Sequence, residues 1–237
     1  MGKKKRKRKS RTPPAKRPQA CSLALCMIVK DEEQMLPDCL ASVRGLVEQV
    51  VVVDTGSSDR TVALAEAAGA QVVSFPWCDD FAAARNAALP RVETDWILML
   101  DADERLAPGA AAGIRKAIAD GGLDCGFLPL LDAEKLDSRP EDVLAGTARK
   151  GAPLLLPRLF RVSKDFRWEG IVHESISTWL SGDKKTGRVD APIIHLGNVD
   201  SFRQERGKGE RNLRLLRKRV DQEPDSAVAR SYLAREL

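Results

Sequence analysis

Residues 96–104 read WILMLDADE, and the first five of them form an unbroken apolar run. Such a run, without the alternation of a half-buried strand, is typical of a strand that is covered on both faces of a sheet. The run ends abruptly at Asp101 and Asp103, two carboxylates that point to the same side when the chain stays extended. This stretch therefore predicts a buried strand with an acidic pair at its carboxyl end.

The same pattern repeats on either side of this stretch. Polar or turn-forming residues end each apolar run, and segments with helical spacing lie between the runs. We predict strands at 22–29, 50–53, 71–75, 96–100 and 125–130, and helices at 31–45, 61–68, 81–89 and 108–119. Strands joined by crossover-length helices indicate an α/β fold with a mainly parallel central sheet and helices on both of its faces.

Polar clusters follow three of these strands, at residues 30–32, 54–59 and 101–103. Ligands of open α/β sheets bind outside the carboxyl ends of the strands, so the clusters predict one ligand site. Asp101 and Asp103 can hold a hard divalent cation, Mg²⁺ or Mn²⁺, with substrate phosphates completing its coordination. Asp54 can accept hydrogen bonds from a base or a ribose hydroxyl. Its alternative role is to cap the following turn, although Ser58 or Asp59 suits that role better.

The alternation weakens after residue 131. We predict loop-like structure over residues 132–152, which are rich in charge, Gly and Pro. Further along the chain we predict short strands at 154–161, 170–176 and 191–196, and helices at 201–220 and 226–237. The predicted organisation is a disordered basic arm over residues 1–20, an α/β domain over 21–200 and a C-terminal helical extension over 201–237.

Charge is divided unevenly along the chain. The net charge is +5, yet residues 1–19 contain ten Lys and Arg and no acid, which leaves 29 bases against 34 acids in the remainder. Seven like charges in a row at residues 3–9 repel each other and do not pack. Such an arm either contacts anionic membrane or nucleic acid without specificity or has no dedicated partner. The remainder has one Tyr and no nucleic-acid-binding signature, which argues against a nucleic-acid-binding domain.

Cysteine usage and hydropathy indicate the cellular compartment in which the protein is expected. Five cysteines without a C-x-x-C pair indicate reduced thiols rather than a disulfide framework or a zinc site. No apolar run reaches the ~18 residues of a membrane span, and the basic N-terminus leads into no apolar secretory core. We therefore predict a cytoplasmic protein, and the basic arm leaves association with a membrane surface open.

Four motifs, in order along the chain, resemble those of family 2 glycosyltransferases: residues 25–33 (LCMIVKDEE), 51–61 (VVVDTGSSDRT), 75–86 (FPWCDDFAAARN) and 96–106 (WILMLDADERL). The most similar branch is the one often fused to tetratricopeptide repeats, which includes bacteriocin S-glycosyltransferases. The resemblance covers roughly residues 22–215. It implies a GT-A fold for the domain at 21–200, a nucleotide-sugar donor (a UDP-sugar before others), Mn²⁺ or Mg²⁺, and transfer with inversion.

The resemblance also implies roles for single residues. Glu174, in GIVHE at residues 170–174, is the candidate base for the acceptor's proton, and His173 is its rival. His195 matches another family position, where an imidazole either completes the coordination of Mn²⁺ beside Asp101 and Asp103 or has only a structural role. The candidate donor contacts are Lys30, Asp31, Glu32, Asp54, Arg85, Asn86, Asp101, Lys208 and Arg211.

The sequence departs from the family pattern at two positions. Asp31 stands where the family usually has Asn, a difference expected to alter the contacts with the nucleotide base. Asn198 stands where an aromatic residue is common, a difference expected to alter the acceptor side of the site. Lys208 and Arg211 either reach the diphosphate or lie on a solvated basic helix. The residues from Pro224 onward resemble the start of a tetratricopeptide repeat, but one partial repeat defines no partner surface.

Three functions are compatible with these residues. A metal-dependent inverting glycosyltransferase is favoured, and a non-catalytic nucleotide-sugar-binding module is the alternative. A haloacid-dehalogenase-type phosphatase also places a D-x-D motif after an apolar strand, but there the motif comes near the start of the domain, whereas here Asp101 lies deep inside it. The sequence names neither the sugar nor the acceptor, which can be a peptide, a lipid or a glycan.

Overall fold

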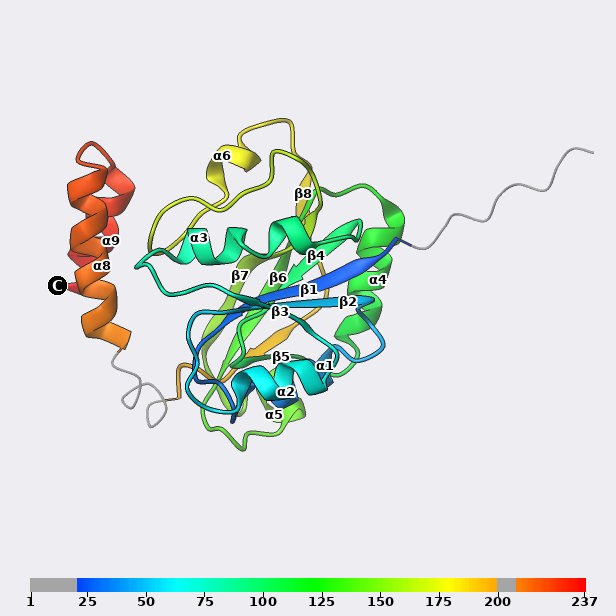
Figure 1. Ribbon diagram of the computed structural model, residues 1–237. Coiled ribbons are helices and arrows are strands. Elements are labelled where there is room, and N and C mark those ends of the chain that lie inside the picture. The colour runs from blue at the N-terminus through cyan, green and yellow to red at the C-terminus, as the bar shows by residue number, and fades with distance from the viewer. Residues whose placement is uncertain (1–20, 200–207) are drawn as a thin grey trace, which may run out of the picture.

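The computed structural model describes residues 21–199 and 208–237. The predicted basic arm and the first part of the helix predicted at 201–220 lie outside the described residues. In chain order (Figure 1) the elements are β1 (Leu23–Val29), α1 (Leu36–Ser42), β2 (Gln49–Asp54), α2 (Thr61–Ala67), β3 (Gln71–Ser74), α3 (Phe81–Asn86), a 3-10 turn (Leu89–Arg91), β4 (Trp96–Met99), β5 (Glu104–Leu106), α4 (Ala110–Asp120), β6 (Cys125–Ala133), α5 (Pro140–Ala145), β7 (Arg149–Arg161), α6 (Ser177–Leu180), β8 (Thr186–Arg188), β9 (Ile193–His195), α8 (Lys208–Gln222) and α9 (Ala227–Glu236).

One sheet contains these strands in the order β3-β2-β1-β4-β7-β6-β9-β5, with β8 paired to β6. β3, β2, β1 and β4 are parallel neighbours, and β7 is antiparallel to both β4 and β6. β8 and β9 pair parallel with β6, whereas β5 runs antiparallel to β9. The sheet is therefore mainly parallel, as the sequence predicted, and only β7 and β5 run against the other described strands.

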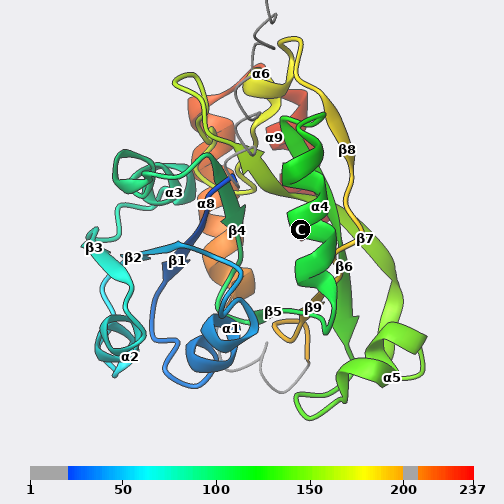
Figure 2. The same cartoon turned by 90° about the vertical axis from the view of Figure 1, so that its right-hand side faces the viewer.

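The alternation of side chains along β1 explains why helices cover both faces of the sheet. Leu23, Leu25 and Met27 face a core that includes residues of α1, α2, α4 and α5. Ala24 and Cys26 face a second core, to which α3 and α6 contribute. All five side chains are fully buried, as expected for a strand between two layers of helices. Figures 1 and 2 show α3 on one side of the sheet and α1 and α2 on the other.

Two predictions for the second half of the chain are wrong. Residues 132–152 are not loop-like: they contain the end of β6, all of α5 and the start of β7. The apolar runs that indicate strands are weak in these residues, because β7 pairs with β6 at an end of the two strands that is largely exposed. Charged and small residues are tolerated there. Residues 170–176 form no strand and contribute only an isolated bridge between Glu169 and Ser175.

The helix predicted at 31–45 is also shorter than expected. It begins at Leu36 with Pro37 in its first turn, the position where a missing amide donor costs least. The residues between β1 and α1 instead form a turn, in which Asp31 has a φ of 52°. The polar cluster at residues 30–32 therefore lies in this turn and not in the helix. The turn directly follows β1, which places the cluster at the edge of the sheet.

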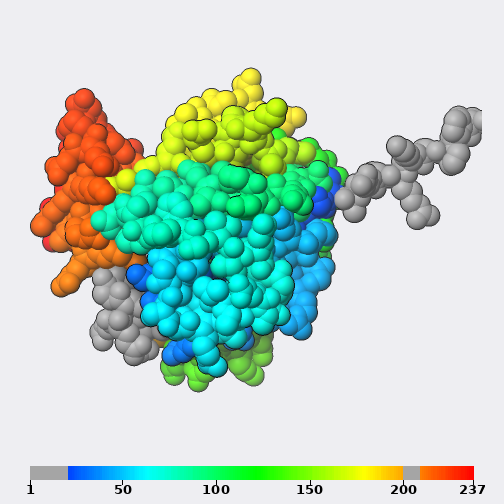
Figure 3. Space-filling model, in the orientation of Figure 1, coloured from blue at the N-terminus to red at the C-terminus, as the bar shows by residue number. Residues whose placement is uncertain are grey.

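The C-terminal helices α8 and α9 pack on each other and against the segment that follows Gly170. Leu215 and Leu216 of α8 are fully buried beside Val172, and Tyr232 of α9 packs on the same cluster. In the space-filling view, α8 and α9 lie against one end of the α/β body (Figure 3). The domain boundary predicted near residue 200 stays a prediction. In the part of the chain that the structure describes, no helix combines the length and apolar character needed to cross a bilayer.

Candidate active site

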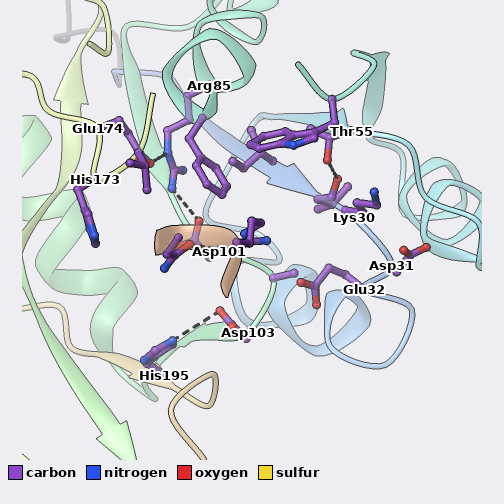
Figure 4. Close-up of a pocket in the computed structure, with 18 residues that line it drawn as sticks. Lys30, Asp31, Glu32, Thr55, Arg85, Asp101, Asp103, His173, Glu174 and His195 are labelled. Carbon is purple, nitrogen blue, oxygen red and sulfur yellow. Dashed lines mark hydrogen bonds and ion pairs between the residues drawn. The ribbon is translucent and has the colours of Figure 1, made fainter. Parts of the chain in front are cut away.

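A cleft of about 640 Å³ opens beyond the carboxyl ends of β1, β2 and β4, where the polar clusters predicted a ligand site. His173 and Glu174 line the cleft on the side away from Lys30 and Asp31 (Figure 4), and residues at the start of α8 also line it. The lining residues are Ile28, Val29, Lys30, Asp31, Glu32, Thr55, Trp77, Phe81, Arg85, Asp101, Ala102, Asp103, Val172, His173, Glu174, His195, Arg211 and Asn212.

Most of the predicted site residues meet in this cleft, although they come from distant parts of the chain. The ones that line it are Lys30, Asp31, Glu32, Arg85, Asp101, Asp103, His173, Glu174, His195 and Arg211. Asp54 and Asn86 do not line it, and the side chain of Lys208 lies outside the part of the chain that the structure describes. The parallel strands thus gather the predicted residues, while the function of each residue stays a prediction.

Asp101 lies between two nearly buried arginines. Nη2 of Arg85 donates to Oδ1 at 3.1 Å, and Nη2 of Arg158 lies 3.4 Å from Oδ2. Enclosure in the cleft would raise the pKa of Asp101, but the two guanidinium charges hold it well below its usual range. Asp101 is therefore ionised at neutral pH, and the two arginines fix the direction of its carboxylate.

Glu104 holds the second of these arginines beneath the cleft. It is 1% exposed, forms an ion pair with Arg158 and accepts a hydrogen bond from the backbone amide of Asp101 at 3.0 Å. Burial raises the pKa of Glu104 to about 7, and the charge of Arg158 opposes that rise. Glu104 and Arg158 were not predicted for the site, because one follows the D-x-D motif as an ordinary charged residue and the other lies within an apolar strand.

The acidic pair does not stay extended, contrary to the sequence-based expectation. The amide of Glu104 donates to the carbonyl of Asp101 at 3.0 Å, so the chain turns between the two aspartates. As a result the carboxylate of Asp101 faces Arg85, whereas Asp103 faces His195 of β9 (Figure 4). Of the two, Asp103 is the one that faces His195, and the predicted metal roles of both aspartates stay predictions.

The buried Asp103 and the partly exposed His195 form a pair. Asp103 is 5% exposed, and its Oδ1 lies 3.7 Å from Nε2 of His195. The other ring nitrogen, Nδ1, lies 2.6 Å from Oδ1 of Asp132, which also accepts a hydrogen bond from Asn198 at 3.0 Å. Burial lowers the pKa of His195, but the bond to Asp132 and the charge of Asp103 outweigh burial and raise it. Asp132 thus orients the ring so that Nε2 faces Asp103.

This arrangement fits a divalent cation with two protein ligands. A carboxylate oxygen and an imidazole nitrogen are donors that Mn²⁺ accepts, and a carboxylate behind the ring, here Asp132, is a common partner of metal-binding histidines. Within residues 21–199 and 208–237, no group of three or more His, Cys, Asp and Glu side chains is placed to hold a metal ion. A cation at Asp103 and His195 therefore needs the phosphate oxygens of its substrate to complete its coordination.

Gly197 lies directly against this pair, and its replacement provides a test of the proposed metal ligands. A Cβ atom at position 197 would lie 2.6 Å from Nε2 of His195 and closer still to Oδ2 of Asp103. Gly197→Ala is therefore expected to displace both side chains and weaken Mn²⁺ binding to the UDP complex about tenfold or more. Calorimetric titration of Mn²⁺ into protein and UDP measures this affinity. Gly122→Ala, at a position with open space, is the matched control; equal affinities in both variants would contradict the assignment.

Arg85 joins Asp101 to the candidate base. Its Nε donates to Oε1 of Glu174, and both side chains are largely buried. Burial lowers the pKa of Arg85, but the charges of Glu174 and Asp101 outweigh burial and raise it above its ordinary value. Asp80 caps the helix that carries Arg85 by accepting a hydrogen bond from the amide of Ala83 at 2.8 Å. Arg85 thus holds the two carboxylates at fixed positions relative to each other.

His173, the rival base, lines the cleft next to Glu174. Its φ of 49° is left-handed, which is uncommon for any residue other than glycine. The imidazole is stacked on the ring of Tyr232 in α9, with centroids 4.3 Å apart and planes 13° from parallel. Burial lowers the pKa of His173 below its ordinary value of 6.5, so the ring is neutral at pH 7 and able to accept a proton.

Asp54 caps its own turn instead of lining the cleft. Its carboxylate accepts hydrogen bonds from the amides of Gly56 at 3.2 Å and Ser57 at 3.1 Å. Asp59 does accept a hydrogen bond from the amide of Thr61 at the start of α2, at 2.9 Å, but the expectation that Asp54 would be left free is wrong. The turn brings Ser57 and Ser58 close to the end of β1, where the amide of Ser58 donates to Asp31 at 2.7 Å. Asp31, the departure from the family's Asn, thus ties the two strand ends together.

Asn86 also lies outside the cleft lining. Its side-chain amide donates to the carbonyl of Trp168 at 2.8 Å and accepts from the amide of Trp168 at 2.8 Å. These two bonds attach α3 to the segment that leads into residues 170–174. The donor-binding role of Asn86 stays a prediction, and its observed contacts are structural.

Fold and cleft together define a class of protein. Residues 24–166, more than half of the chain, match the model of Glycosyl transferase family 2. The chain therefore belongs to glycosyltransferase family 2, which confirms the resemblance seen in its motifs and gives no support to the phosphatase alternative. A TPR repeat-containing protein of Synechococcus elongatus is 36% identical over 218 residues, covering 89% of this chain and 51% of the relative.

A second relative and a solved structure agree with this family. The SPbeta prophage-derived glycosyltransferase SunS of Bacillus subtilis is 24% identical over 216 residues, covering 89% of this chain and 48% of the relative. The chain spans about half the length of these two curated relatives. Residues 1–349 of S. aureus TarS superpose with a TM-score of 0.53 at 14% identity, covering 90% of this chain and 69% of that chain. The predicted GT-A fold is thereby confirmed.

Proposed function

We propose that this chain transfers a sugar with inversion from a nucleoside-diphosphate donor, a UDP-sugar before others, in a metal-dependent reaction. The acceptor is a peptide, a lipid or a glycan. The proposal rests chiefly on one observation: the Asp103–His195 pair and the Arg85–Glu174 pair line the same cleft. Support also comes from the family and from TarS, whose structure in complex with UDP has the same fold at a TM-score of 0.52.

The donor is proposed to lie along the strand ends. Residues 28–32 and Thr55 line the part of the cleft next to β1 and β2, and the hydroxyl of Thr55 donates to the carbonyl of Val29 at 3.0 Å. This part is assigned to the nucleoside, in keeping with the usual ligand position in α/β sheets. The diphosphate is assigned to the space between Asp103 and Arg211. When bound there, a divalent cation supplies positive charge that stabilises the departing diphosphate.

The transfer itself is one in-line displacement at the anomeric carbon. The acceptor atom forms its bond to that carbon while the bond to the phosphate oxygen breaks, and the nucleoside diphosphate leaves with the electron pair. The acceptor's proton must pass to a base on the face opposite the leaving group. We assign this role to Glu174, whose carboxylate Arg85 orients, and keep His173 as the alternative.

A donor panel tests the proposed function. Purified protein is incubated with UDP-, GDP- and dTDP-sugars in Mn²⁺, Mg²⁺ or EDTA, and the release of free nucleoside diphosphate is measured. We expect slow release from at least one donor with either cation, water serving as the acceptor, and none in EDTA. Release that is equally fast in EDTA would contradict the metal dependence. The anomeric configuration of the sugar product, read by NMR at early times, tests inversion.

One further outcome separates the enzyme from the non-catalytic alternative. Calorimetric binding of UDP with Mn²⁺ but no release from any donor would favour the non-catalytic binding module.

The cytoplasmic location and the contact of the basic arm with anionic membrane or nucleic acid stay predictions, because the arm lies outside the described residues.

A further inference from the structure

The C-terminal helices contact the segment that carries both candidate bases. Arg219 of α8 is 7% exposed, and its Nη1 donates to the carbonyls of Val172 at 2.6 Å and His173 at 3.2 Å. A buried arginine that donates to two successive carbonyls fixes the path of the backbone there. The same side chain pairs with Glu223, which directly follows the last residue of α8, and this pair holds the guanidinium in place.

The backbone at Gly170 leaves room for the guanidinium of Arg219. Gly170 has a φ of 89°, and a Cβ at that position would lie 2.8 Å from Cζ of Arg219. Glycine is therefore required both for the backbone conformation and for the approach of the guanidinium. Three residues later, His173 holds a left-handed φ without being glycine, a conformation that persists only where the surroundings impose it.

α9 supplies the second contact with this segment. The ring of Tyr232 stacks on the imidazole of His173 at 4.3 Å between centroids. The charged groups that act on this imidazole are Glu174 on its own segment, Arg219 on α8 and Glu236 on α9. The stack therefore determines both the direction of the ring and how far water reaches it.

α8 also contacts the opposite wall of the cleft. Arg214 forms two hydrogen bonds with Asp79, at 2.6 and 2.8 Å, and the same carboxylate accepts from the indole of Trp77 at 2.8 Å. Trp77 and Phe81 line the cleft, and the guanidinium of Arg211 lies 5.1 Å from the ring centroid of Phe81. One helix thus contacts the segments that form two walls of the cleft.

We propose that α8 and α9 are part of the catalytic machinery, and that Arg219 and Tyr232 are positioning residues that hold the His173–Glu174 segment against the donor. The proposal rests on the proposed function, because the His173–Glu174 segment has a catalytic role only in that reaction. Neither residue touches the reacting atoms; both act through the segment. The contacts of Arg219 and Tyr232 are therefore needed for turnover, and not for binding of the nucleotide at the strand ends.

The test compares the full wild-type chain with single-residue variants of it. Arg219→Met and Tyr232→Ala remove the two contacts, whereas Arg217→Met and Val228→Ala change exposed positions on the same helices and serve as matched controls. Three quantities are measured: UDP affinity with Mn²⁺ by calorimetry, the rate of UDP release from the best donor, and the titration of His173 by NMR. The chain has two histidines, so His173→Gln assigns the signal.

We expect release to slow about tenfold or more in Arg219→Met and Tyr232→Ala, because a small misplacement of a reacting group costs this much, while UDP affinity stays within twofold. In Tyr232→Ala the pKa of His173 rises, because removing the stacked ring relieves the burial that lowers it. Tyr232→Phe, which keeps the ring, restores both quantities.

Normal release rates in Arg219→Met and Tyr232→Ala would overturn the proposal. An unchanged titration of His173 in Tyr232→Ala would overturn the positioning role of Tyr232 even if all rates fell. Weakened UDP binding in both variants, with lost helical signal in circular dichroism, would show a purely structural role and also overturn it. If the wild type releases UDP from no donor, the proposed function fails, and the His173 titration still tests whether the stack positions the ring.

Discussion

Asp103→Ala is expected to lower the metal-dependent release of UDP from its sugar donor by about 10²–10³-fold, the usual cost of losing one preorganised charge at a departing anion. Asp103 is 5% exposed and lies 3.7 Å from His195, so its removal leaves His195 as the single proposed protein ligand for the cation. Release rates at saturating donor, measured over a series of Mn²⁺ concentrations, separate weaker cation binding from slower chemistry.

The matched control for this variant is Asp120→Ala, which removes an exposed carboxylate at the end of α4. It is expected to release UDP at the wild-type rate with the same Mn²⁺ dependence. Melting curves of both variants without UDP or metal establish that each is folded. Wild-type release in Asp103→Ala would contradict the assignment of Asp103 to the cation.

Glu174→Gln is expected to slow sugar transfer about 10²–10⁴-fold, the range that a positioned general base contributes. The amide keeps the size of the side chain but cannot take up the acceptor's proton. Because Arg85 pairs with Glu174 and with Asp101, the variant leaves the second of these ion pairs in place. UDP affinity with Mn²⁺ is therefore expected to stay within a few fold of the wild type.

His173→Gln provides the comparison that decides between the two candidate bases. If Glu174 is the base, His173→Gln slows release less than Glu174→Gln and leaves its dependence on pH unchanged. If His173 is the base, the order is reversed, and the fall of the rate toward acid pH, as the imidazole becomes protonated, disappears in His173→Gln. Full activity in both variants would contradict a base on this segment.

Much of the fold could be predicted because its decisive signals are local. The apolar runs that became β1, β2, β4 and β6 lack alternation because both of their faces are buried, and the polar clusters follow because the strands end at a ligand site. The first part of the antiparallel β7 was not predicted as a strand. It pairs at an exposed end of the sheet, where almost any residue is tolerated, so its sequence carries no strand pattern.

The supporting residues of the site could not be predicted, since their partners are far apart in the chain. Asp132 meets His195 across 63 positions, and Arg158 meets Glu104 across 54. Nothing local marks any of these contacts: Arg158 stands in an apolar strand, and Asp132 stands among residues whose sequence predicts a loop. The pairing of β6 with β7 and β9, and of β9 with β5, brings these residues next to their partners.

The most direct measurement is the anomalous scattering of manganese in crystals soaked with UDP and Mn²⁺. We expect one peak in contact with the carboxylate of Asp103, Nε2 of His195 and the diphosphate, with Glu174 facing the same space from the opposite wall. A peak held by the diphosphate alone, or one elsewhere on the molecule, would contradict the metal site on which the proposed reaction depends.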